Sequence, residues 1–192
     1  MEILYYLTAT CLTLVVVLGF YDGFYLHLWK YELFNHKDSL YEHKTHTARA
    51  ILFPIIIWLL FINNDTISFW IGVTAAIIDL IILGVDAYSE KDSRKFMGGL
   101  PRQEYLIHLI VNGLHFASLF LLLSLKLEIT DSNLAIIENI NETSGSQLLD
   151  FIAVQAIPGS ILFAITHLLL LIPKVKFNWD KLKVKLSKMK GH

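Results

Sequence analysis

The sequence predicts an all-α, polytopic membrane protein, built as a bundle of five transmembrane helices. Its 192 residues are 55% hydrophobic and only 17% charged. The mean hydropathy is +0.54, far on the apolar side of soluble globular proteins. The single cysteine, Cys11, lies in an apolar run, which excludes a disulfide framework and a cysteine-based metal site.

Five stretches are long enough, or nearly so, to cross the roughly 30 Å hydrocarbon layer of a bilayer. They are Ile3–Phe20, Ala48–Ile62, Ile67–Val85, Tyr105–Leu127 and Leu148–Ile172. The second run is short, and we expect its helix to begin earlier, at Ser39. Pro54 and Pro158 predict local kinks rather than helix ends. The first run lacks a basic start and a small-residue cleavage site, so we expect a retained helix rather than a signal peptide.

The basic residues predict the orientation of the chain. If all five runs cross the membrane, fifteen of the sixteen lie on one side, and Lys126 is the exception. The positive-inside rule then places the N-terminus outside and the C-terminus in the cytoplasm, in a bacterial inner membrane. The chain divides into one bundle domain, residues 1–173, and a basic cytoplasmic tail, residues 174–192. The tail is either an interfacial segment that attracts anionic lipid headgroups or an ordinary solvated tail.

The composition of two connecting segments predicts their structure. Residues 23–34 carry aromatic side chains among His27, Lys30 and Glu32, which predicts a helix at the membrane surface with His27 peripheral to any site. The polar stretch Glu128–Gln147 predicts an outer loop that is partly disordered.

Two segments of the chain resemble each other. Each has an aspartate just after a Leu-Gly pair, followed by Glu-x-x-x-His: Asp22, Glu42 and His46, then Asp86, Glu104 and His108. The copies match only with a small gap, and Glu32 with His36 shows how easily the spacing arises. Both copies occupy the same topological place, an inward-running helix followed by an outward-running one. An internal two-helix duplication and a chance likeness both remain open.

The polar residues of the spans fall into two tiers. Residues four or seven apart share one face of a helix, and polar stripes in membrane helices face the bundle interior. The tier near the predicted cytoplasmic surface contains Asp22, Glu42, His43, His46, Asp86, Glu104 and His108. Asp79, His115 and His167 lie deeper, about 10 Å further in by helical rise. At that depth an unpaired carboxylate costs several kcal/mol, so these residues need each other or a ligand.

Histidines and carboxylates in this pattern indicate a metal site. One carboxylate from each of two helices, with a Glu-and-His pair from each of two others, is the layout of carboxylate-bridged di-iron bundles. The likeness is to the layout only, because those bundles use a three-residue Glu-to-His spacing and this chain has four. The candidate metal ligands are Asp22, Glu42, His46, Asp79, Asp86, Glu104, His108, His115 and His167.

Structural explanations remain open for the tier near the surface. Ser39 and Glu42 have the spacing of a capping box. Pro101 places Glu104 in a first helical turn, where the helix dipole favours a carboxylate. The two aspartates can instead pair with an arginine, at Arg49, Arg94 or Arg102.

These features predict a membrane metalloenzyme. A di-iron centre oxidising a hydrophobic substrate, such as a lipid, isoprenoid or quinone, is the leading hypothesis, with a redox partner on the cytoplasmic side. The alternatives are a zinc-dependent hydrolase, a haem-binding electron carrier with His115 and His167 as axial ligands, and a proton or ion transporter. The sequence shows no phosphate-binding glycine loop, no nucleophile motif and no nucleic-acid signature.

Overall fold

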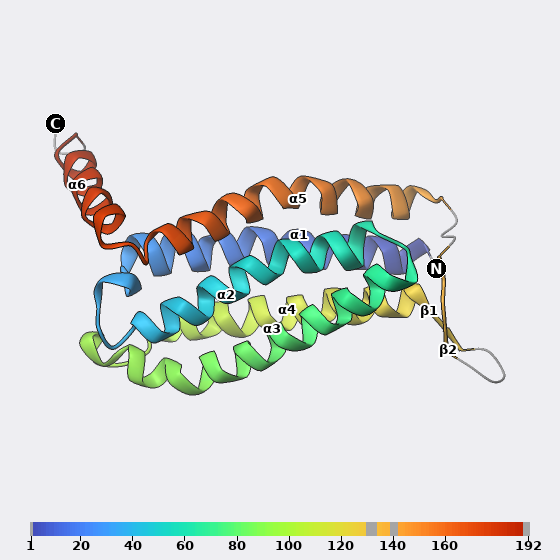
Figure 1. Cartoon of the computed structure of the whole chain (residues 1–192), viewed down its shortest axis with the longest axis horizontal. Coiled ribbons are helices and arrows are strands. Elements are labelled where there is room, and N and C mark those ends of the chain that lie inside the picture. The colour runs from blue at the N-terminus through green and yellow to red at the C-terminus, as the bar shows by residue number, and fades with distance from the viewer. Residues whose placement is uncertain (1, 130–133, 139–141, 190–192) are drawn as a thin grey trace.

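The computed structural model confirms an all-helical bundle and describes residues 2–129, 134–138 and 142–189 (Figure 1). Five helices in this part of the chain are long and apolar enough to cross a membrane, as in an integral membrane protein. They are α1 (Glu2–Phe20) with its π-helical continuation η1 (Tyr21–Lys30), α2 (Leu40–Ile56) with the π-helical η3 (Ile57–Ile62), α3 (Thr66–Ser93), α4 (Arg102–Lys126) and α5 (Ser144–Leu169). The five expected spans are therefore confirmed as helices, whereas their orientation stays a prediction.

Local chemistry sets where these helices begin. The Asp65 side chain accepts a hydrogen bond from the backbone N–H of Ser68, 2.9 Å away, at the start of α3. Thr143 and Ser146 form a capping box before α5. As the sequence predicts, α2 begins directly after Ser39, but the Ser39 side chain makes no capping bond. The capping-box explanation of α2 is therefore not supported.

The two prolines inside helices have different surroundings. Pro54 lacks a backbone donor, and three residues later α2 widens into η3, where the Asn63 N–H bonds to the Trp58 carbonyl at 3.2 Å. The disturbance predicted at Pro54 thus coincides with a change of helix type. Pro158 lies within α5, which continues past it.

The segment after α1 differs from the expected surface helix. Residues 21–30 continue α1 directly as η1, which ends with the Tyr31 N–H bonded to the Leu26 carbonyl at 2.9 Å. Because this bond joins residues five apart, side chains with that spacing come onto one face. Glu32 then adopts a left-handed backbone (φ 49°), and a short 3₁₀ turn, η2 (Leu33–Asn35), returns the chain to α2.

The helices separate an apolar half from a polar half. α1 packs against α4 and α5, and α2 packs against α3 and α5. The apolar core lies in the half that contains the N-terminus and η3, and it includes Leu12, Ile57, Leu60, Phe69, Leu122 and Leu149. The polar side chains gather in the other half. This half ends at α6 and at the α1–α2 and α3–α4 connections, here called the basic end (Figure 1).

The connection between α4 and α5 contains a short hairpin. β1 (Leu127–Ile129) pairs antiparallel with β2 (Leu134–Ile136). The disorder expected in this connection is not tested at residues 130–133 and 139–141, which lie outside the described residues. At the basic end, the 3₁₀ turn η4 (Lys95–Met97) links α3 to α4.

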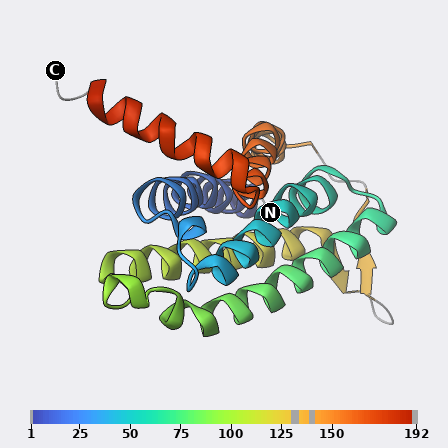
Figure 2. The ribbon, with the colours of Figure 1, turned by 60° about the vertical axis from the view of Figure 1, so that its left-hand side comes forward.

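The basic tail forms a separate helix, α6 (Pro173–Met189), which projects from the bundle (Figures 1 and 2). Its Trp179 ring lies 6.1 Å from the Trp29 ring. The Lys183 ammonium donates to the Trp29 carbonyl at 2.6 Å and pairs with Glu32. The tail is thus a helix held against the end of η1, and its position relative to a membrane stays a prediction.

Candidate metal centre

Ionisable side chains from the first four helical spans meet at the basic end. We call this group the His–carboxylate cluster: Asp22 and His27 from η1, Glu42 and His46 from α2, Asp86 and Glu90 from α3, and Glu104 and His108 from α4. His27, Glu42 and Glu104 are fully buried. The cluster therefore forms inside the protein rather than on its solvated end.

His27 and His108 bring their ring nitrogens together on one side of the cluster. Their Nε2 atoms are 3.0 Å apart, and Nε2 of His108 is also 3.0 Å from Oδ2 of Asp22. Oε1 of Glu104 lies 3.3 Å from Nε2 of His27. Asp22, His27 and His108 thus offer ligand atoms that all lie within 4.8 Å of one another.

His46 occupies the other side. Its Nε2 lies 3.4 Å from Oε1 of Glu42 and 3.3 Å from Oδ2 of Asp86. The His27 and His46 rings meet edge to face, with centroids 4.3 Å apart. His27, Glu42 and His46 therefore form a second group of ligand atoms within 4.8 Å, and His27 belongs to both groups.

These spacings match those of atoms that share a metal ion. Two ligand atoms bound at about 2.0–2.1 Å, with about 90–110° between the bonds, lie about 2.8–3.4 Å apart. The Nε2–oxygen separations around His46 and His108 fall in this range. Asp22 Oδ1, Glu42 Oε1 and His46 Nε2 are also buried without a hydrogen-bond partner. Buried lone pairs of this kind are costly unless a cation or a donor satisfies them.

With its histidines neutral, the cluster carries more negative than positive charge. The guanidinium that contacts the cluster in the described part of the chain is that of Arg94, which is fully buried; Nη1 lies 2.5 Å from Oε2 of Glu42, and Nη2 pairs with Glu104. Five carboxylates facing one guanidinium leave an excess of four negative charges when the histidines are neutral. Such a charge is not tolerated in a buried site without further cations or protons.

Neighbouring side chains orient the candidate ligands. The His108 Nδ1–H donates to the Glu90 carboxylate, which leaves Nε2 of the same ring facing the cluster. The Thr45 hydroxyl donates to Asp86, and the Ser93 hydroxyl donates to the Glu42 carboxylate. A histidine that binds a metal typically donates its other ring N–H to a carboxylate in this way.

Each of the two similar sequence segments contacts the other one within the cluster. Asp22 of the first segment contacts His108 of the second, and Asp86 of the second contacts His46 of the first. The glutamates of both segments pair with Arg94. A two-fold relation between the halves would produce these reciprocal contacts, although the duplication itself stays a prediction.

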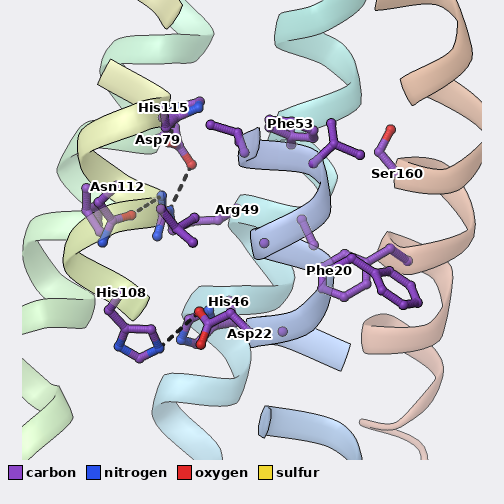
Figure 3. A pocket seen from close by; sticks show the side chains of 18 of the residues that line it. Phe20, Asp22, His46, Arg49, Phe53, Asp79, His108, Asn112, His115 and Ser160 are labelled. Carbon is purple, nitrogen blue, oxygen red and sulfur yellow. Dashed lines mark hydrogen bonds and ion pairs between the residues drawn. The ribbon is translucent and has the colours of Figure 1, made fainter. Parts of the chain in front are cut away.

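A separate group of polar residues, the deep network, lies beyond the cluster (Figure 3). Arg49 donates from Nε to Oδ1 of Asp79 at 3.1 Å and from Nη2 to Oδ1 of Asn112 at 3.3 Å. His115 Nε2 is 3.3 Å from Oδ2 of Asp79. The expectation that Asp79 and His115 need each other or a ligand is met by this contact and by Arg49, which neutralises the carboxylate. Their role as metal ligands stays a prediction.

His167 is placed apart from the deep network. Its carbonyl oxygen is 3.2 Å from Nε2 of His43, and the two rings stack with centroids 5.2 Å apart. The ring of Phe163 is 4.4 Å away on the same helix. His167 thus packs beside the start of α2 rather than next to Asp79 and His115, and its proposed ligand role is likewise untested.

A cavity of about 450 Å³ connects the cluster to the deep network. This volume is typical of small-molecule sites. Its polar lining comes from the two groups, and its apolar lining is contributed chiefly by α1, α2 and α5: Val15, Val16, Val17, Phe20, Ala50, Phe53 and Phe163. Figure 3 shows His108, Asp22 and His46 at one end of this space and His115 with Asp79 at the other.

The structure brings together all six candidate ligands of the tier near the surface. These are Asp22, Glu42, His46, Asp86, Glu104 and His108. Sequence reasoning missed Glu90, and the peripheral placement of His27 is wrong because its side chain is fully buried in the cluster. Arg94 was expected as a partner of the aspartates, whereas it pairs with the glutamates. A signal for Glu90 was present, since it lies four residues after Asp86 on one helix face.

Comparisons with known protein families, with curated proteins and with solved structures find no match to this chain.

Proposed function

We propose that the protein is a membrane metalloenzyme that binds a pair of iron ions in the His–carboxylate cluster and oxidises a hydrophobic substrate. The observation that carries this proposal is the buried excess of negative charge, whose ligand atoms have the spacing of a metal coordination shell. Two divalent ions would balance the excess of four charges. A single ion would balance half of it.

The donor set supports iron over the other metals considered. Imidazole binds both iron and zinc, whereas several carboxylates gathered around two positions are typical of di-iron bundles. Asp22, His108 and Glu104 would hold one ion, and Glu42, His46 and Asp86 the other, with His27 serving one of the two. When bound, a di-iron centre supplies oxygen activation for hydroxylation or desaturation.

The surrounding residues supply position and a dry environment. Arg94 fixes the Glu42 and Glu104 carboxylates, and Glu90 fixes the orientation of the His108 ring. The apolar lining of the cavity accommodates a hydrocarbon chain beside the cluster and excludes bulk water. This lining favours oxidation of an alkyl or isoprenoid chain over hydrolysis, which needs water at the same place.

Metal analysis of the purified protein tests the proposal. We expect about two iron atoms per chain after reconstitution with Fe²⁺ under anaerobic conditions, in line with the two ligand groups. His108→Ala and Glu104→Ala should each lower the iron content while leaving helix content and elution volume unchanged. His36→Ala is the matched control, because the His36 ring stacks on Phe96 outside both ligand groups.

The alternatives give different results in the same measurement. Zinc retained in place of iron would support the hydrolase, and a Soret band would support the haem carrier. A protein that binds no transition metal, or variants with unchanged metal content, would contradict the proposed centre. Oxidation of an added lipid by the iron-loaded protein with a chemical reductant would extend the test to the reaction.

A further inference from the structure

The cavity lining reaches the outside of the bundle beside α1 and α5, and we take this place as its opening. Val17 and Phe20 line it, yet these side chains are 59% and 54% exposed. Gly159 of α5 also lines the cavity and is exposed, and a Cβ atom there would meet nothing within 4 Å. At one edge of this opening Phe163 packs on Gly23, where a Cβ atom would overlap its ring. A bundle that spans a membrane presents this opening to lipid.

The deep network presents hydrogen-bond donors to the same cavity. An arginine carries five N–H donors, and the bonds found among the described residues use Nε and Nη2 of Arg49. Since Asn112 accepts from Arg49 through Oδ1, its Nδ2 group is a donor directed elsewhere. Both residues line the cavity. An oxygen atom that enters it can therefore accept from two neighbouring side chains.

The charge of the deep network determines whether a charged or an uncharged oxygen of a ligand binds there. Arg49 is already paired with Asp79, so the network has no surplus positive charge. A carboxylate or phosphate would lie close to Asp79 and to the acidic cluster, and repulsion would oppose its binding. An uncharged carbonyl oxygen, which only accepts hydrogen bonds, suits two converging donors.

The distance to the cluster limits which part of the ligand reaches it. Arg49 follows His46 by three residues on α2, and Asn112 follows His108 by four residues on α4. These intervals correspond to about 4.5–6 Å, or roughly one helical turn, along the axis. A carbonyl held by Arg49 and Asn112 therefore leaves its nearest carbons beside the cluster.

We propose that the cavity binds a long-chain molecule with an uncharged carbonyl group, whose oxygen accepts hydrogen bonds from Arg49 and Asn112 while its chain leaves between α1 and α5. This site deepens and rests on the proposed function, because it names the substrate class: a neutral carbonyl lipid oxidised near its carbonyl end. Quinones, long-chain ketones and esters belong to this class, and free fatty acids do not.

Binding of three probes to the metal-free protein in detergent tests the site. 2-Pentadecanone, pentadecane and palmitate share a long chain and differ in the head, and native mass spectrometry reports their affinities. We expect the ketone to bind about tenfold more tightly than the hydrocarbon, as hydrogen bonds to a partly buried cation predict. Equal binding of ketone and hydrocarbon, or tighter binding of palmitate, would overturn the proposal.

Two pairs of variants sharpen the result. Asn112→Leu removes one donor and should reduce the ketone's advantage several-fold. Arg49→Met should abolish this advantage, but it leaves the Asp79 carboxylate without its guanidinium partner. Asn112→Leu therefore decides the question if Arg49→Met does not fold. Gly159→Leu should block all probes, and Gly113→Leu, where a Cβ also meets nothing within 4 Å but does not line the cavity, should block none.

The two proposals fail separately in these experiments. Iron analysis concerns the cluster, and ketone binding is measured without metal. If the protein binds iron but shows no preference for the ketone, the proposed metal centre is supported and the carbonyl site is contradicted. If the protein prefers the ketone, and this preference depends on Arg49 and Asn112, but it binds no metal, the carbonyl site is supported and the proposed metalloenzyme function is contradicted.

Discussion

His108 shows how a single side chain can be prepared to bind a metal. Its Nδ1–H donates to Glu90, so Nε2 is the nitrogen available to an ion beside Asp22 and His27. Without Glu90 the ring can rotate or exchange its tautomer, and both changes weaken a ligand. The four-residue spacing from Asp86 places Glu90 on the inward face of its helix, but only the structure shows that Glu90 contacts His108.

Glu90→Gln should therefore lower the iron affinity by about 10–100-fold while preserving the fold. Competition with a chromophoric chelator measures this affinity directly. Glu128→Gln, at an exposed position of the hairpin, is the matched control and should leave the affinity unchanged. An affinity in Glu90→Gln equal to that of the wild type would show that Glu90 does not position the histidine.

The helices demonstrate what hydropathy can and cannot predict. Each apolar run became a helix because a lipid-spanning chain must satisfy its backbone bonds internally. The runs did not predict the polar ends of the helices: α3 was expected over residues 67–85 and extends to Ser93. This polar extension contains Glu90 and Ser93, and Arg94 follows it directly. Hydropathy cannot predict it, because most of its residues are not apolar.

The π-helical η1 explains the error at His27. In an α-helix, residues five apart lie about 140° around the axis, which would turn His27 away from Asp22. In η1 the i→i+5 bonds bring both onto the cluster side. No residue pattern distinguishes such a segment from an ordinary α-helix before the structure is known.

Because η1 aims His27 at both ligand groups, His27→Ala should lower the bound iron at least as much as His108→Ala does. The other histidine of this connection, His36, serves as the control, as its ring stacks on Phe96 with centroids 3.7 Å apart. Elemental analysis on the three variants gives the comparison. Full iron content in His27→Ala would indicate that the side chain fills the core and binds no ion.

The docking of α6 depends on an ion pair that is sensitive to acid. Burial raises the pKa of the Glu32 carboxyl, and hydrogen bonds from Lys183 and Asn35 outweigh this effect, so the pKa lies below its ordinary value of 4.5. A depressed carboxyl pKa stabilises the docked state above that ordinary value, and this contribution is lost as the pH falls through the folded-state pKa.

Amide hydrogen exchange of α6 should therefore accelerate as the pH drops below 4.5, after correction for the intrinsic rate. Lys183→Met should give fast exchange at neutral pH as well. Lys185→Met, on an exposed position of the same helix, should not. Exchange that is independent of both pH and Lys183 would show that the Trp179 contacts alone hold the helix.

The bundle as a whole combines an apolar half with a polar half whose charges do not cancel. The sequence predicted this division, because the polar stripes of α3 and α4 point inward and the spans alternate in direction. It did not predict which charges would meet. Arg94 comes to the two glutamates from the turn after α3, a contact fixed by the α3–α4 connection rather than by any local pattern.

Arg94 and a bound metal have overlapping electrostatic roles, which leads to a prediction about stability. Removing one partner of a buried ion pair costs about 3–5 kcal/mol, because the remaining charge is left uncompensated. Arg94→Met should therefore strongly destabilise the metal-free protein. Ions that bind only the folded state add stability, about 2.7 kcal/mol at a free concentration of 100 times Kd, and they neutralise the same glutamates.

The loss of stability caused by Arg94→Met should accordingly be smaller in the iron-loaded protein than in the protein whose metal a chelator has removed. Denaturant unfolding of wild type and variant, each with and without Fe²⁺, completes the double cycle. Arg102 is exposed at the start of α4, and Arg102→Met should leave the free energy of unfolding unchanged both with and without iron. Equal losses with and without iron would mean that Arg94 and the metal do not share the glutamates, and that the excess charge of the cluster is balanced by protons instead.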